Sequence, residues 1–148
     1  SEAQRRARIE NFFMPYHRAT HDLIESRIAA GRRPALISMH SFTPVMNGFE
    51  RPWKIGVLWN KDGRLPLPLI HRLRAIDIQV GDNEPYSGRD NHGYSQHVHA
   101  DDRGLANALI EVRQDLIDTH HGAEEWGGIL SRVLQEILSD PELYRAYP

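Results

Sequence analysis

The sequence contains no cysteine among its 148 residues. This absence excludes a disulfide framework and a thiolate metal site, so His, Asp, Glu and water are the zinc ligands left to consider. The apolar runs are short, and none approaches the ~20 residues that a bilayer-spanning helix requires. The N-terminus is charged and polar, unlike a signal sequence. We therefore expect no membrane partner and take the cytoplasm as the default location.

A strong net charge is also missing. The chain has 18 Lys and Arg and 20 Asp and Glu residues, a formal net charge of -2. No basic run is interleaved with aromatic residues, which is the pattern typical of nucleic-acid-binding proteins, so no nucleic-acid partner is expected. An anionic small molecule stays open, because arginines can cluster locally without changing the total. The length and the 40% hydrophobic content suit one globular domain, residues 1–148.

Hydrophobic periodicity predicts helices at both ends of the chain and short strands between them. A capping box at Ser1 opens an amphipathic helix that continues to Gly31, and another amphipathic helix covers residues 123–139. Prolines open a short helix at residues 65–75. Ser95 is expected to cap a further short helix that ends at Gly104.

Apolar runs between these helices have the length of strands. The predicted strands are residues 35–39, 53–59, 76–80 and 105–116. The first is a continuous apolar run, which favours a central strand covered on both faces. Helices that alternate with apolar strands indicate the α/β class, here a three-layer sandwich with a mostly parallel or mixed sheet flanked by helices.

Two of these strands carry a residue that a buried strand normally excludes. His40 follows the strand at residues 35–39, and Glu111 lies within the strand at residues 105–116. Burying either side chain is costly unless it is paired, hydrogen-bonded or bound to metal, and a metal ligand and a general base would meet that condition. His40 could instead be a hydrogen-bonded structural histidine. Glu111 could pair with Arg113 on the solvated face of an edge strand.

Other polar segments are candidates for function. Residues 81–93 form a long loop of turn formers, and loops of that length are usually functional or disordered. His17 and His21 lie four apart on the first helix but on the flank of its apolar stripe, which favours a solvated helix edge over a metal site. His97 and His99 diverge if their segment is a helix and share a face if it is a strand.

Several motifs, in this order along the chain, resemble those of the N-formylglutamate amidohydrolase family. They are FMPYH (13–17), ISMHSFTP (37–44), RPWKIGVLW (51–59), VGDNEPYSG (80–88), HA (99–100), RGL (103–105) and IEVRQDL (110–116). That family is similar in fold to the zinc carboxypeptidases, a phosphorylase/hydrolase-like fold. The resemblance implies that His40 is a zinc ligand at the end of a strand and that Glu111 is the general base.

The same resemblance implies a reaction and a set of substrate-binding residues. The reaction is hydrolysis of an N-formyl or other N-acyl amino acid with an acidic side chain, most simply N-formylglutamate to formate and glutamate. Zinc would activate a water, Glu111 would take the proton of that water, and arginines would bind the substrate carboxylates. Arg113 could instead only orient Glu111. The implied substrate-binding residues are Arg113, Arg89, Arg51, Asn83, Glu84 and Tyr86.

The chain differs from the family pattern at its start. Family members carry an upstream Asp-His-Ala-Gly-like segment that is expected to supply the other zinc ligands and part of the pocket. We therefore expect these residues to be the C-terminal portion of such a domain, as a piece of a longer protein or as a shortened relative. Two alternatives are a zinc hydrolase of the same scaffold acting on another N-acyl amino acid or peptide, and an inactive binding domain.

Overall fold

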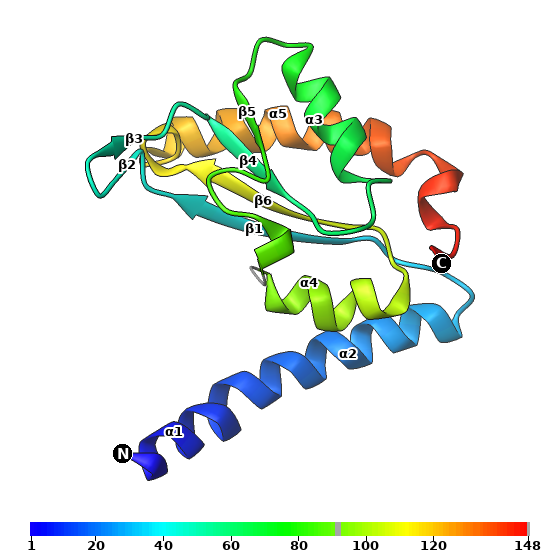
Figure 1. Ribbon diagram of the computed structural model, residues 1–148. Helices are drawn as coiled ribbons and strands as arrows, with labels where there is room; N and C mark the ends of the chain where they lie inside the picture. The colour runs from blue at the N-terminus through cyan, green and yellow to red at the C-terminus, as the bar shows by residue number, and fades with distance from the viewer. Residues whose placement is uncertain (91–92, 148) are drawn as a thin grey trace. The chain divides into compact units, whose positions relative to one another are not determined.

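The computed structural model describes residues 1–90 and 93–147 and divides the chain into two compact units, residues 1–34 and residues 35–148 (Figure 1). Residues 91 and 92 of the predicted loop lie outside the described residues. The calculated hydrophobicity of the described helices is too low, over the length required, for any of them to cross a membrane.

The first unit is a continuous helical segment with one wide turn. It contains α1 (Glu2–Arg8), the π-helix η1 (Ile9–Phe13) and α2 (Met14–Ala29). The predicted capping box is confirmed, because Gln4 N donates to Ser1 Oγ and the N-terminal amino group donates to Gln4 Oε1 at 2.8 Å. A π-turn holds more residues than an α-turn, so side chains before and after it lose their common face. Phe12, Tyr16 and Leu23 of the predicted apolar stripe are exposed.

The second unit contains a four-stranded mixed sheet. Its strands, in spatial order, are β1 (Leu36–Phe42), β6 (Asn107–Arg113), β4 (Ile55–Leu58) and β5 (Val80–Asp82). β1 runs parallel to β6, β6 is antiparallel to β4, and β4 is parallel to β5. A small hairpin of β2 (Val45–Met46) and β3 (Phe49–Glu50) turns at Asn47 and Gly48, both with positive φ.

Two strand predictions need correction. The sheet of the described chain has β1 at its edge rather than at its centre, and residues Met39 to Ser41 are exposed. An apolar run shows that a strand is buried in part but does not show how many neighbours it has. The strand predicted at residues 76–80 begins only at Val80, because hydrogen-bonded turns follow the preceding helix and continue through Asp77, which has a φ of 57°.

Helices cover both faces of this sheet, as predicted (Figure 1). α3 (Pro66–Arg74) and α5 (His120–Leu138) lie on one face, where they bury a core with the strands. α4 (Tyr94–His99) packs against β1 and β6 on the other face. The main core side chains are Ile55, Val57, Leu69, Leu73, Ile110, Val112, Trp126 and Leu130.

The ends of two helices differ from the prediction. α4 begins after Gly93, which has a φ of 92°, so Ser95 lies inside the helix and does not cap it. Gly104, with a φ of 60°, ends the following 3-10 turn η3 (Asp101–Arg103), as expected. α5 begins three residues earlier than predicted, because Thr119 Oγ1 accepts a hydrogen bond from Gly122 N at 3.0 Å.

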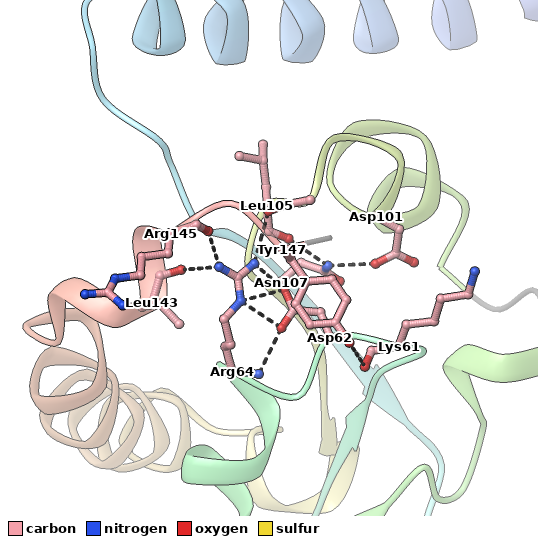
Figure 2. A network of polar contacts seen from close by, with 10 residues as sticks. Lys61, Asp62, Arg64, Asp101, Leu105, Asn107, Leu143, Arg145 and Tyr147 are labelled. Atoms are coloured by element: carbon pink, nitrogen blue, oxygen red, sulfur yellow. Dashed lines mark hydrogen bonds and ion pairs between the residues drawn. The ribbon is translucent and has the colours of Figure 1, made fainter.

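Arg64 joins three separate segments of the second unit, as Figure 2 shows. Its guanidinium binds the carboxylate of Asp62, which is only 5% exposed. It also donates to the carbonyl oxygens of Leu143 at 3.1 Å, Gly104 at 3.0 Å and Arg145. The guanidinium stacks on the ring of Tyr147 as well, 5.2 Å from the centroid. These contacts fix residues 143–147 to the turn that precedes β6.

We predict that Arg64→Met lowers the free energy of unfolding by roughly 2–3 kcal/mol, because the buried Asp62 loses its cation and three carbonyls lose a donor. Arg72→Met is the matched control, since Arg72 pairs with Glu136 between largely exposed side chains. Such surface pairs contribute less than about 1 kcal/mol. Urea denaturation of both variants measures the difference, and equal losses would contradict a special role for Arg64.

Candidate functional site

His40 and Glu111 lie side by side on the sheet. They are direct partners in the register of the parallel strands β1 and β6. Directly opposite residues on adjacent strands project to the same face, so both side chains share the face that α4 partly covers. Glu111 is 7% exposed and its Oε2 atom is shielded from solvent, whereas His40 is exposed. This burial excludes the alternative in which Glu111 stands on a solvated edge strand.

Two glycines continue the row beyond Glu111. Gly56 on β4 is the partner of Glu111, and Gly81 on β5 is the partner of Gly56. A Cβ atom at Gly56 would lie 2.2 Å from the carbonyl oxygen of Glu84, and one at Gly81 would lie 2.4 Å from the same oxygen. The loop backbone at Glu84 therefore rests directly on the sheet beside Glu111. Glycine within a strand pattern is a signal for such close approach, and the sequence analysis missed it.

Asn83 holds this loop in place. Its Oδ1 accepts hydrogen bonds from the backbone N–H groups of Trp59 at 2.9 Å and Gly88 at 3.0 Å. Its own N–H donates to the carbonyl of Val57 at 3.0 Å, and its φ is 56°. The amide oxygen of Asn83 is thus engaged in fixing the loop to the end of β4, while the side chain of Glu84 is exposed.

Arg51 and Tyr86 form a contact at the other end of the loop. Arg51 is 6% exposed, and its Nη1 donates to Tyr86 Oη at 3.2 Å and to the carbonyl of Thr43 at 3.2 Å. The guanidinium lies 5.0 Å from the ring centroid of Tyr86 and 5.7 Å from that of Phe42, within cation–π range. Within residues 1–90 and 93–147, no carboxylate pairs with Arg51.

Arg113 is bound within the protein. It forms a bidentate pair with Asp115, with Nε 2.7 Å from Oδ1 and Nη2 3.0 Å from Oδ2. Hydrogen bonds from Arg113 hold the pKa of Asp115 below its usual value. Nη1 donates to the carbonyls of Arg51 at 3.2 Å and Trp53 at 3.4 Å. The ion pair of Arg113 is therefore with Asp115 rather than with Glu111, and its predicted contact with a substrate stays a prediction.

Arg89 differs from the other two arginines because its side chain is exposed. Its guanidinium lies 4.9 Å from the ring centroid of Trp59. The indole N–H of Trp59 donates to Asp82 Oδ1 at 2.7 Å, so the ring is fixed at the end of β4. This arrangement keeps a positive charge beside the loop.

Within the described part of the second unit, no other histidine forms a metal-binding group with His40. His17 and His21 belong to α2 in the first unit. On α4, His97 is exposed with Nδ1 3.7 Å from Asp102 Oδ1, whereas His99 is 2% exposed, so the two diverge as expected for a helix. Among the described residues, no group of three His, Cys, Asp or Glu side chains could hold a metal ion. These residues therefore do not fit a complete zinc site, although His40 could supply one ligand.

Comparison with models of protein families identifies one family. The model of the family described as N-formylglutamate amidohydrolase matches residues 1–118. The structure is similar to the crystal structure of a gene product of Agrobacterium tumefaciens, with a TM-score of 0.89 and 34% sequence identity. The similarity covers 94% of this chain and 55% of that chain, so this chain spans about half the length of its structural neighbour. A search of curated proteins found no match.

We predict that Gly56→Ala lowers the free energy of unfolding by about 1–3 kcal/mol, because the added methyl group overlaps the Glu84 carbonyl. Gly127→Ala is the control: it lies on α5, and a Cβ there meets no atom within 4 Å. That change should raise stability by up to ~1 kcal/mol through helix propensity. Urea denaturation gives both values. An unchanged stability of the Gly56→Ala variant would show that the loop leaves the sheet easily.

Proposed function

The chain belongs to the N-formylglutamate amidohydrolase family, and we propose that the protein hydrolyses an N-formyl amino acid, with N-formylglutamate as the substrate. The observation that carries this proposal is the register of β1 and β6, which sets His40 beside the buried Glu111 on one face of the sheet. The zinc-carboxypeptidase-like scaffold is part of the same proposal, supported by the mixed sheet with helices on both faces.

Glu111 is the proposed general base. A water above this face of the sheet would lose a proton to the Glu111 carboxylate and add to the formyl carbon. The amide C–N bond would then break as Glu111 returns the proton to the departing nitrogen, giving formate and a free amino acid. The central strand β6 supports this role, because its pairing on both sides fixes the backbone that carries the carboxylate.

The anionic groups of the substrate require cations nearby. Arg51 supports this part of the proposal, because its charge has no acidic partner in residues 1–90 and 93–147. Arg89 is exposed beside the same loop. We propose these two as carboxylate ligands ahead of Arg113, whose guanidinium is bound to Asp115. Tyr86 contacts Arg51 and would line the same place.

Zinc is also proposed, with His40 as one ligand. A zinc site needs three or four protein ligands, and the described residues do not supply such a set. The remaining ligands would have to come from outside these residues. The role of Glu111 as a base can be tested independently of the identity of those ligands.

Glu111→Gln keeps the size and shape of the side chain but removes its basic oxygen. In the full-length, zinc-loaded protein we expect turnover of N-formylglutamate, measured as formate release, to fall ~10²–10⁴-fold, since general-base assistance is typically of that size. The melting temperature should change little. Glu136→Gln is the control, because Glu136 is exposed on α5 and pairs with Arg72. Near wild-type turnover in the Glu111→Gln variant would show that Glu111 is structural and that the proposed mechanism is wrong.

We further predict that the purified 148-residue chain retains little zinc after dialysis against a chelator. A single proposed ligand, His40, would bind zinc far more weakly than a complete set. Atomic absorption measures the bound metal per chain. One retained zinc per chain would contradict the prediction. His17, His21, His97 and His99 would then be replaced singly to find the missing ligands.

A further inference from the structure

A cavity of about 210 Å³ lies beside Glu111 on the same face of the sheet. Leu109 lines the cavity and precedes Glu111 by two residues on β6, and its partner on β4, Leu58, lines it as well. Residues two apart on a strand share a face and are separated by roughly 7 Å. An amino-acid derivative with its amide bond at Glu111 could therefore extend its side chain into this cavity.

The walls of the cavity differ in polarity. Leu58 and Leu109 on the sheet, together with the ring of Trp59, provide apolar surface. α4 and the start of β6 provide polar groups, among them Gln96 and Asn107. The shape suits a side chain with an aliphatic stem and a polar end, because the stem can contact the leucines while the end reaches the amides.

Gln96 has a donor that the described chain leaves unused. The residue is 6% exposed and lines the cavity, and its Nε2 is buried without a hydrogen-bond partner among the described residues. An unpaired buried donor destabilises a protein, so its presence calls for a physical reason. Its Oε1 lies close to Gly93, where a Cβ atom would be 3.1 Å away. The unused group is therefore the amide nitrogen, and because Nε2 is itself shielded from solvent, a ligand in the cavity would contact it after the amide turns toward the cavity.

Asn107 is already occupied. It is 4% exposed, and its Nδ2 donates to Asp101 Oδ1 at 2.8 Å and to the carbonyl of Leu105 at 3.1 Å. The exposed Arg89 stacks on the outer residue Trp59 and adds a positive charge near the wall. A ligand with a hydrogen-bond acceptor thus has Gln96 as its buried donor.

We propose that this cavity holds the amino-acid side chain of the substrate and that Gln96 Nε2 donates a hydrogen bond to an acceptor at the end of that side chain. This inference rests on the proposed function. The shared chemistry is a short aliphatic stem that ends in a carboxylate or a carboxamide. Gln96 would thus discriminate between substrates by their amino-acid side chains. It belongs neither to the loop at residues 81–93 nor to the three candidate arginines.

The test compares three substrates of the full-length, zinc-loaded protein: N-formylglutamate, N-formylglutamine and N-formylnorleucine, which lacks the acceptor. Gln96→Met keeps the volume but removes the donor. We expect kcat/KM for the better of the two acceptor-bearing substrates to fall about 10-fold or more, mainly through KM, because one buried hydrogen bond is lost. N-formylnorleucine should be turned over as well as before or better. The melting temperature should not fall, since an unpaired buried donor has been removed.

Gln79→Met is the matched control, because Gln79 is exposed ahead of β5 and the chemical change is identical. A second variant, Gln96→Glu, places a carboxylate at the same position. It should lower kcat/KM for N-formylglutamate more than for N-formylglutamine, because like charges repel. If the wild type hydrolyses N-formylglutamate and Gln96→Met keeps the wild-type preference over N-formylnorleucine, this inference is wrong and the proposed function stands. If the wild type hydrolyses none of the three substrates, the proposed function fails and this inference fails with it.

Discussion

The parallel pairing of β1 with β6 is the interaction on which the candidate site depends. Ala108, Ile110 and Val112 pack into the core beside α3 and α5, so the alternate residues of β6 must project to the opposite face. A shift by one residue would turn Glu111 into that core, which burial of a carboxylate opposes. The hydrophobic core therefore sets the face on which Glu111 lies, and the observed pairing with β1 places His40 beside it on that face. Stability and the proposed chemistry are fixed by the same alternation along one strand.

Much of the fold follows from local sequence patterns. The capping box at Ser1, the 3-10 turn ended by Gly104 and the strand at residues 55–58 were predictable because their signals lie within a few residues. The edge position of β1 was not predictable, since an apolar run does not show how many strands pair with it. The start of α4 was placed wrongly because Ser95 is a good capping residue, whereas Gly93 in fact takes the left-handed conformation there.

The candidate site was predictable only in part. His40 and Glu111 stood out because each is a polar residue in an apolar run, and they lie on the same face of the sheet. Other contacts could not be predicted because they depend on three-dimensional geometry. Arg113 pairs with Asp115, and Asn83 binds the backbone of Trp59 and Gly88. Gln96 gave no signal in the sequence, because a glutamine on a short helix is ordinarily exposed. Its burial follows from the way α4 packs on the sheet.

The contact between the Glu84 carbonyl and the two strand glycines also affects how this sequence can vary. Neither Gly56 nor Gly81 has a positive φ, so space rather than backbone conformation restricts each position to glycine. A loop residue fills that space, so whether either strand position tolerates a larger residue depends on the loop. An insertion or deletion that lifted Glu84 would open both positions to alanine, whereas alanine arising first would be selected against. Substitutions at these three positions should therefore show epistasis, with the loop changing before the strands.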